Sequence, residues 1–217
     1  PRDQTVETAS PLDVVTGLSL LKSFTLDPDT GALGVMQRMV NASPNASRHS
    51  LHDRTLCPAG GFVLFRLPKQ SQHRAGWAVL RATETGSVFD GEQPASPNVR
   101  VFGDLLVAHA AGAPGKLGSD TDGGWVAYVR GRLLFVKYFQ TWRGAAYAGA
   151  GHTVEFSWSD QMAALELFSP VTALQPGQAF DFPELWQLIE LKEDVTSFDE
   201  ARAAAKKVPA SPFAPKK

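Results

Sequence analysis

The sequence predicts an all-β protein built as an antiparallel sandwich, with one short helix near the C-terminus. Roughly ten short segments alternate between apolar and polar side chains, and residues typical of turns separate them. None of these segments has the 3.6-residue period of an amphipathic helix. With 217 residues, of which 43% are hydrophobic, the chain can build one good core. We therefore expect a single sandwich domain over residues 17–191.

The first strands are predicted from alternation and from turn chemistry. Residues 1–16 are polar and are expected to form an N-terminal arm or an edge segment. Residues 18–26 alternate as a half-buried strand, and Asp27-Pro28-Asp29-Thr30-Gly31 has the proline, aspartate and glycine of a tight turn. Residues 33–40 then return as the second strand of a hairpin.

Residues 50–56 are expected to form a strand with one polar face. His52 and Arg54 alternate with Leu51 and Asp53, so the two basic side chains point the same way on a strand. A face of this kind is polar enough to line a cleft.

Further strands are expected at 62–65, 76–80, 87–89 and 99–107, where apolar residues lie between turn signals. The first of these is apolar throughout and reads as a buried strand. Residues 68–98 are otherwise the least regular part, as in a surface loop that is functional or mobile.

The second half of the chain continues the pattern. Residues 125–129 and 133–139 are predicted to form an antiparallel hairpin around Arg130-Gly131-Arg132. Residues 152–158 alternate as another strand, and 185–191 are expected to be the last one.

Only the C-terminal part is predicted to be helical. Ser197-Phe198-Asp199-Glu200 has the spacing of a capping box and opens an alanine-rich run to Lys207. Residues 192–217 are thus expected to form a short helix and a flexible tail.

One carboxylate, Glu166, lies inside a strand whose two faces are both apolar. Ala163, Leu165 and Leu167 form one face, and Ala164 lies with Glu166 on the other. A strand of this kind is covered on both sides, so we expect Glu166 to be poorly solvated. Burial would raise its pKa, as a general base working near neutrality requires. The alternative is a glutamate that points to solvent or is held by a structural arginine.

Composition excludes several function classes. The formal net charge is -1 and no long cluster of lysine and arginine occurs, so nucleic acid is not an expected partner. No run of about 18 apolar residues exists that could span a membrane. Cys57 is the only cysteine, which excludes an intrachain disulfide and a cysteine-based zinc site.

The chain begins at Pro1 without a signal-peptide pattern, a start that processing or an incomplete chain would both produce. Removal of an upstream export signal would make the protein periplasmic or secreted. The compartment is therefore not indicated.

Five histidines raise the question of a metal. His49 and His52 are three residues apart and point to opposite sides of a strand, while His73, His109 and His152 are isolated in sequence. We therefore expect no metal and no other cofactor. A serine nucleophile is not expected either, because the chain has no Gly-x-Ser-x-Gly motif.

Aromatic side chains near loops favour carbohydrate binding, because sugars present apolar ring faces and many hydroxyls. The candidates are Trp125, Tyr128, Trp142, Arg143, Tyr147 and Trp158. The alternative is that each aromatic packs in the core or at an edge, which is the commoner role for any one of them.

Several short motifs, taken in order, resemble the galactose-mutarotase-like superfamily and are most similar to an uncharacterised bacterial branch of it. They are Thr16-Gly17-Leu18-Ser19-Leu20 with Lys22-Ser23-Phe24-Thr25-Leu26, Val40-Asn41-Ala42-Ser43, Ser50-Leu51-His52-Asp53, Pro58-Ala59-Gly60-Gly61, Lys116-Leu117-Gly118, Gly124-Trp125-Val126-Ala127-Tyr128, Phe135-Val136-Lys137 and Leu165-Glu166 followed by Leu174-Gln175-Pro176-Gly177. The resemblance covers about residues 16–191. It implies a β-supersandwich that holds a carbohydrate on the concave face of its large sheet.

The resemblance also implies roles for residues. In sugar mutarotases a glutamate base takes the proton of the anomeric hydroxyl while a histidine acid protonates the ring oxygen. Glu166 matches the base and His52 matches the acid, with His49 close enough to compete. The expected substrate-binding residues are Arg54, Trp125, Lys137, Trp142, Arg143, Tyr147 and His152.

Two hypotheses follow. The first is a carbohydrate-active protein that uses Glu166 and His52 as an epimerase does, and the second is a non-catalytic carbohydrate-binding or assembly subunit. Side chains that face one cleft at roughly 5–8 Å, wide enough for a pyranose ring, would favour catalysis. Mutarotase domains usually have further N-terminal strands, so the resemblance implies an N-terminal portion or another subunit that completes the sandwich.

Overall fold

The computed structural model describes residues 4–83, 86–91 and 97–213, and these ranges contain sixteen strands and one helix. The strands are β1 (Thr5–Ala9), β2 (Leu18–Leu26), β3 (Leu33–Asn41), β4 (Ser47–His49), β5 (His52–Pro58), β6 (Phe62–Arg66), β7 (Ala78–Thr83), β8 (Gly86–Gly91), β9 (Val99–Phe102), β10 (Leu105–His109), β11 (Gly115–Ser119), β12 (Trp125–Phe139), β13 (Val154–Trp158), β14 (Met162–Phe168), β15 (Thr172–Leu174) and β16 (Ala179–Val195). The helix α1 spans Phe198–Ala205.

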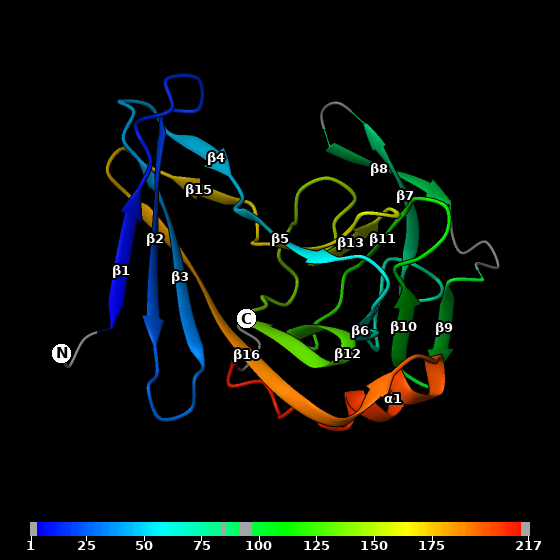
Figure 1. The fold of residues 1–217 in the computed structure, drawn as a ribbon. Helices are drawn as coiled ribbons and strands as arrows, with labels where there is room; N and C mark the ends of the chain where they lie inside the picture. The colour runs from blue at the N-terminus through cyan, green and yellow to red at the C-terminus, as the bar shows by residue number, and fades with distance from the viewer. Residues whose placement is uncertain (1–3, 84–85, 92–96, 214–217) are drawn as a thin grey trace.

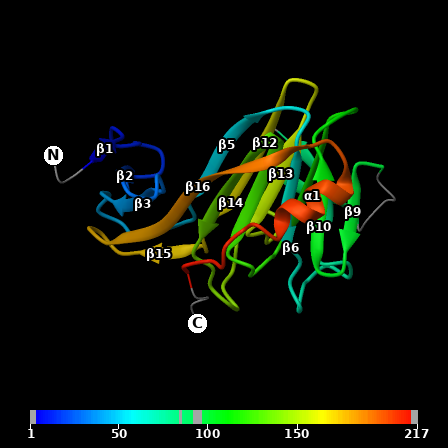
Figure 2. The same cartoon turned by 60° about the horizontal axis from the view of Figure 1, so that its bottom comes forward.

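The strands form two main antiparallel sheets and one small sheet (Figure 1). The large sheet has the order β1-β2-β3-β16-β12-β6-β10-β9, and the six-stranded sheet has the order β5-β14-β13-β11-β7-β8. Strands β15 and β4 pair separately. The long strand β16 runs from β3 at one end of the molecule to α1 at the other, so it joins the outer strands to the rest (Figure 2). The all-β sandwich with a short C-terminal helix is thus confirmed.

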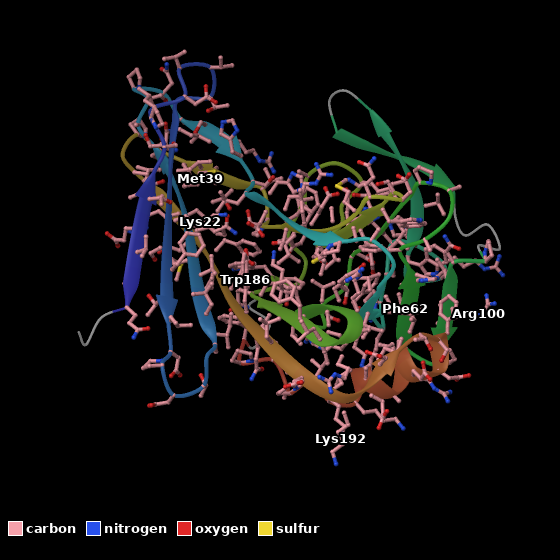
Figure 3. All side chains as sticks on the ribbon, in the orientation of Figure 1. Lys22, Met39, Phe62, Arg100, Trp186 and Lys192 are labelled. Atoms are coloured by element: carbon pink, nitrogen blue, oxygen red, sulfur yellow. The ribbon has the colours of Figure 1, made fainter. Side chains whose placement is uncertain are left out.

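Two apolar clusters cover the two faces of the large sheet. The first lies between the sheets, where Val63 and Phe65 of β6 share a cluster with Leu165 and Leu167 of β14. The second lies under α1, which contacts β6, β10, β12 and β16. Phe62 of β6, labelled in Figure 3, belongs to this second cluster. The centroid of its ring lies 5.3 Å from that of the Phe198 ring. Residues 62–65 are therefore buried on both sides, which explains their uninterrupted apolar run.

The expectation of one strand over residues 99–107 is wrong. The chain forms two paired strands there, β9 and β10, and turns between them at Gly103, which has a φ of 66°. Glycine adopts this left-handed conformation without a steric cost.

The expected hairpin around Arg130-Gly131-Arg132 is also wrong. Residues 125–139 form one continuous strand, and Gly131, with a φ of 57°, lies at a bulge where the register against β16 shifts. A glycine with positive φ serves a tight turn or a bulge equally well, and the sequence does not distinguish them. The neighbouring strand β16 favours the bulge, because it has 17 residues and pairs with β12 on both sides of Gly131.

The ends of the chain carry two further features. Residues 5–9 of the predicted arm form the edge strand β1, which pairs with β2. The capping box is confirmed, because Ser197 accepts a hydrogen bond from the backbone of Glu200 and the Glu200 side chain accepts one from the Ser197 backbone. Residues 1–3 and 214–217, at the tips of the predicted arm and tail, lie outside the described residues. Within the described part of the chain, no helix is long and apolar enough to cross a membrane.

Candidate functional site

Four neighbouring strands of the six-stranded sheet bring a row of polar side chains together. Arg54 on β5 pairs with Glu166 on β14, Glu166 pairs with Glu155 on β13, and Glu155 pairs with Gly118 on β11. Cross-strand partners share a face, and alternate residues such as Leu165 point into the core. The row therefore lies on the face of the six-stranded sheet that is turned away from the large sheet.

The Glu166 carboxylate is buried and fully bonded. Its side chain is 4% exposed. The Nε2 atom of His52 lies 3.0 Å from Oε2, the Nζ atom of Lys116 lies 3.0 Å from Oε2 and 3.1 Å from Oε1, and Ser157 donates to Oε1 at 2.9 Å. The expectation that Glu166 is poorly solvated is confirmed. We call the group His52, Lys116, His152, Glu155, Ser157 and Glu166 the Glu166 cluster.

The pKa of Glu166 departs from the expected direction. Burial alone would raise it, but the hydrogen bond with His52 and the positive charge of Lys116 outweigh burial, and the pKa falls from 4.5 to about 2. The expectation of a raised pKa is therefore wrong. The alternative of a glutamate held by a structural cation describes the arrangement better, with Lys116 as the main cation, while the Arg54 Nε lies 4.0 Å away.

The polar contacts continue along the sheet from Glu166. Lys116 also pairs with Glu155 at 2.8 Å, and Glu155 lies 3.4 Å from Nδ1 of His152. The Nε2 atom of His152 lies 2.8 Å from Nε2 of His73. A Cβ atom on Gly118 would lie 2.3 Å from the His152 ring, so the close approach of this ring requires glycine.

His52 is the histidine that contacts Glu166, whereas His49 belongs to β4 in the small sheet. The side chain of His52 is 44% exposed, and its ring stacks on that of Phe168 with the centroids 4.4 Å apart. The His52 and Glu166 side chains share a face, but their direct contact at 3.0 Å leaves no space for a sugar ring between them. The separation that would favour catalysis is therefore absent.

A hollow of about 760 Å³ opens next to this cluster and brings together Trp142, Arg143 and Tyr147. Its other polar lining residues are Arg66, Lys69, Gln70, Gln72, Asp104, Asp120, Thr121, Asp122, Thr141 and Thr153. Gly151 and Thr153, on either side of His152 in the chain, line the hollow, so it lies beside the His152 end of the Glu166 cluster, whose own members do not line it.

The aromatic side chains of the hollow are held by local contacts. The Trp142 ring packs against Phe180 and Phe182, with centroids 5.4 and 6.1 Å apart. The Tyr147 hydroxyl accepts a hydrogen bond from the Trp142 backbone nitrogen at 3.1 Å and donates to its carbonyl at 3.3 Å. The exposed Arg143 pairs with Asp122 at 3.4 Å. The two rings thus form a fixed aromatic wall beside charged groups.

Four predicted substrate-binding residues do not line the hollow. Arg54 and His152 lie in the polar row beside Glu166, where the His152 side chain is fully buried, and the other two lie elsewhere. Trp125 is 7% exposed and belongs to the apolar cluster under α1. Lys137 is completely buried between the two sheets, where it pairs with Asp53 and, at 3.3 Å, with Glu184. Neither side chain is accessible to a ligand in this arrangement, because packing and ion pairing already occupy them.

The sequence analysis missed Lys116 and Glu155 as site residues. Glu155 was visible as an acidic residue that alternates with Val154 and Phe156. Lys116 lies in β11, a segment for which no strand was predicted, and the sequence gives no local sign that β11 lies beside β13. Among the described residues, no group of three or more histidine, cysteine or acidic side chains is placed to hold a metal ion.

Comparisons with known proteins bear on the fold. No family model matches the chain, and no curated protein matches it. Solved structures match it at 10–12% identity. A protein from Synechocystis sp. PCC 6803 has a TM-score of 0.56 and 11% identity, over 88% of this chain and 63% of that one.

Two further matches are a galactose mutarotase-like protein from Lactobacillus casei ATCC 334 and a galactose mutarotase related enzyme from Lactobacillus acidophilus. Their TM-scores are 0.56 and 0.53, with 12% and 10% identity. They cover 85% and 88% of this chain, and 70% of each of the two matched chains. The chain therefore spans about two thirds of the length of these structures, and its fold is the galactose mutarotase-like sandwich.

Proposed function

We propose that this chain binds a carbohydrate in the hollow beside the Glu166 cluster. The observation that carries the proposal is the fixed aromatic wall of Trp142 and Tyr147 in a hollow of about 760 Å³ with charged side chains around it. Aromatic faces stack on the apolar faces of sugar rings, and carboxylates and guanidinium groups bond to hydroxyls. The volume lies within the range of pockets that bind small ligands. The galactose mutarotase-like fold is consistent with this ligand class.

We favour binding without catalysis. A general base works best when its pKa lies near the operating pH, and the pKa of Glu166 is about 2. The Glu166 carboxylate is also held by Lys116 and Ser157, so proton uptake would disrupt these contacts. The epimerase hypothesis keeps one supporting observation, namely the contact between Glu166 and the half-exposed His52 on one face.

Replacing Trp142 by alanine is expected to weaken carbohydrate binding by roughly five- to thirty-fold, because the stacking platform is lost. Isothermal titration calorimetry with a panel of monosaccharides and oligosaccharides identifies the ligand and measures the change. Trp125→Phe is the matched control, since Trp125 lies in the core under α1 and its substitution should leave the affinity unchanged. An unchanged affinity in Trp142→Ala would exclude the hollow as the site.

Polarimetry of freshly dissolved α-anomers of aldoses separates the two hypotheses with the same proteins. Binding without catalysis predicts that the protein does not speed the approach to anomeric equilibrium. An acceleration that Glu166→Gln removes would establish the acid–base mechanism in its place.

The proposal that an N-terminal portion or another subunit completes the sandwich has its own support. Val6, Leu20 and Leu26 are 62%, 45% and 41% exposed, and the strand register places them on one face of β1 and β2. Exposed apolar side chains that share a face are typical of a surface that another part covers. A mass measurement of the native protein is expected to exceed the mass of one 217-residue chain. A mass equal to that of this chain alone would contradict the proposal.

A further inference from the structure

Another hollow, of about 620 Å³, lies along the segment 67–77, which connects β6 to β7. Residues 67–71 and 73–76 of this connection line it, together with Gly103 and Asp104 from the turn between β9 and β10. We call it the second hollow, and we call the hollow with the aromatic wall the first hollow. The volume of the second hollow also lies within the range of pockets that bind small ligands.

The two hollows meet at a shared boundary. Leu67, Lys69, Gln70 and Asp104 line both of them. The first three belong to the β6–β7 connection and Asp104 to the turn between β9 and β10, so the boundary lies between two segments. Within the described part of the chain no ion pair joins Lys69 to Asp104, whose carboxylate pairs with Arg66. The hollows are therefore continuous past the exposed side chains of Lys69 and Gln70.

The connection that forms this boundary is fixed in position. The Asp120 carboxylate accepts hydrogen bonds from the Ser71 hydroxyl at 2.6 Å and from the Gln72 backbone nitrogen at 2.8 Å. The Gln72 side chain donates to the Ala150 carbonyl at 2.8 Å. A Cβ atom on Gly151 would lie 2.6 Å from the Gln72 amide nitrogen, so the connection packs directly on this glycine. Both hollows are thus preformed, which lowers the ordering cost of binding.

The lining of the second hollow suits the continuation of a sugar chain. The exposed polar side chains of Lys69, Gln70 and Arg74 can bond to hydroxyls, and the half-buried Pro68 offers an apolar surface beside them. Among the described residues, no tryptophan, tyrosine or phenylalanine lines this hollow. It therefore suits the extension of a ligand that is anchored on Trp142 better than a separate ligand.

We propose that the ligand of the first hollow is an oligosaccharide. One ring stacks on the aromatic wall, and further rings extend past Lys69 and Gln70 into the second hollow. A monosaccharide is smaller than the drug-sized ligands that either volume suits, and it would leave the second hollow unused. The length of the ligand adds to the carbohydrate binding proposed above, and it rests on that proposal.

Isothermal titration calorimetry of the unaltered protein tests this with glucose, xylose and galactose and with malto-, cello-, xylo- and β-1,4-galacto-oligosaccharides of two to six rings. In a series that binds, we expect the affinity to rise roughly ten- to hundred-fold between one ring and about four, and then to level off. This is the effect of two or three added hydrogen bonds. Equal affinities at every length would overturn the oligosaccharide assignment and leave carbohydrate binding intact. The absence of binding at every length would overturn both.

The variant Arg74→Ala locates the additional rings, because Arg74 lines the second hollow and not the first. It should lower the affinity for a bound tetrasaccharide roughly three- to ten-fold. Arg132→Ala is the matched control, an exposed arginine outside both hollows, and should leave that affinity unchanged. Trp142→Ala should weaken binding at every length, including one ring. A loss in Arg74→Ala no larger than that in Arg132→Ala would exclude the second hollow, and the length series decides the proposal even if a variant fails to fold.

Discussion

Replacing Lys137 by methionine is expected to lower the free energy of unfolding by about 3–5 kcal/mol, the usual effect of removing one partner from a buried ion pair. The Lys137 side chain is completely buried, and its ammonium group pairs with Asp53 and Glu184 and donates to Thr55 at 2.9 Å. It also lies 5.0 Å from the centroid of the Trp186 ring. Methionine keeps the volume and removes the charge, which leaves two buried carboxylates facing one another.

The remaining contacts cannot replace that charge. Lys22 reaches Asp53 at 3.0 Å, and Trp186 donates to Glu184 at 2.8 Å. Lys22 reaches Asp53 of β5 from β2, and Trp186 lies on β16 (Figure 3). Burial already raises the pKa of Glu184 despite the opposing charge of Lys137. Without Lys137 the folded-state pKa values of both carboxyls rise, so the stability difference from the unaltered protein should narrow as the pH falls from 7.

Urea denaturation at pH 7 measures this loss. Arg132→Met is the matched control, because Arg132 lies on the same strand and pairs at 3.1 Å with Glu190 on the surface. An exposed pair of this kind contributes about 0–1 kcal/mol. If Lys137→Met lowered the free energy of unfolding no more than Arg132→Met, the ion pairs of Lys137 with Asp53 and Glu184 would not be desolvated as the structure shows.

Replacing Glu166 by glutamine is expected to remove most of the contribution that the ionised Glu166 carboxylate makes to the free energy of unfolding. This contribution depends on pH. The pKa of Glu166 is about 2 in the folded protein and 4.5 ordinarily. A lowered folded-state pKa contributes stability that is present above the ordinary value and lost as the pH falls towards the folded value. The size of this contribution is about 3 kcal/mol. The variant should be less stable at pH 7, and the two stability curves should converge as the pH falls from about 5 to about 2.

Denaturant unfolding at several pH values between 7 and 2 tests the prediction. Glu190→Gln is the control. Like Glu166, Glu190 lies on a strand and pairs with a cation, but its carboxylate is exposed. Its stability curve should stay close and parallel to that of the unaltered protein. A Glu166→Gln curve that also stays parallel would contradict the low pKa and the ion pair with Lys116.

Local patterns predicted most of the strands, because alternation and turn chemistry act over a few residues. The strands at 18–26, 33–40 and 62–65 and the capped helix lie where they were expected. The strands β4, β11 and β15 were not predicted, and two further errors fell at glycines with positive φ. Gly103 turns the chain where a continuous strand was expected, and Gly131 makes a bulge where a turn was expected.

The candidate site could be predicted only in part. Alternation placed His52 and Arg54 on one face and predicted the burial of Glu166, and the structure agrees on both points. The pairing of Glu166 with Lys116 depends on β14, β13 and β11 lying side by side, and residues 50 apart in the sequence give no local signal of it. The predicted pKa direction failed for this reason.

The sequence by itself determined that this chain forms an antiparallel β-sandwich with one short C-terminal helix, since the alternation of side chains and the capping residues suffice for that conclusion. Only the tertiary structure decided which side chains meet. It gathered Trp142, Arg143 and Tyr147 around one hollow, buried Lys137 and Trp125, and gave Glu166 a lysine partner. The physical reason is that strand order and the layering of the sheets set burial and charge pairing, and both arise from contacts between segments far apart in the chain.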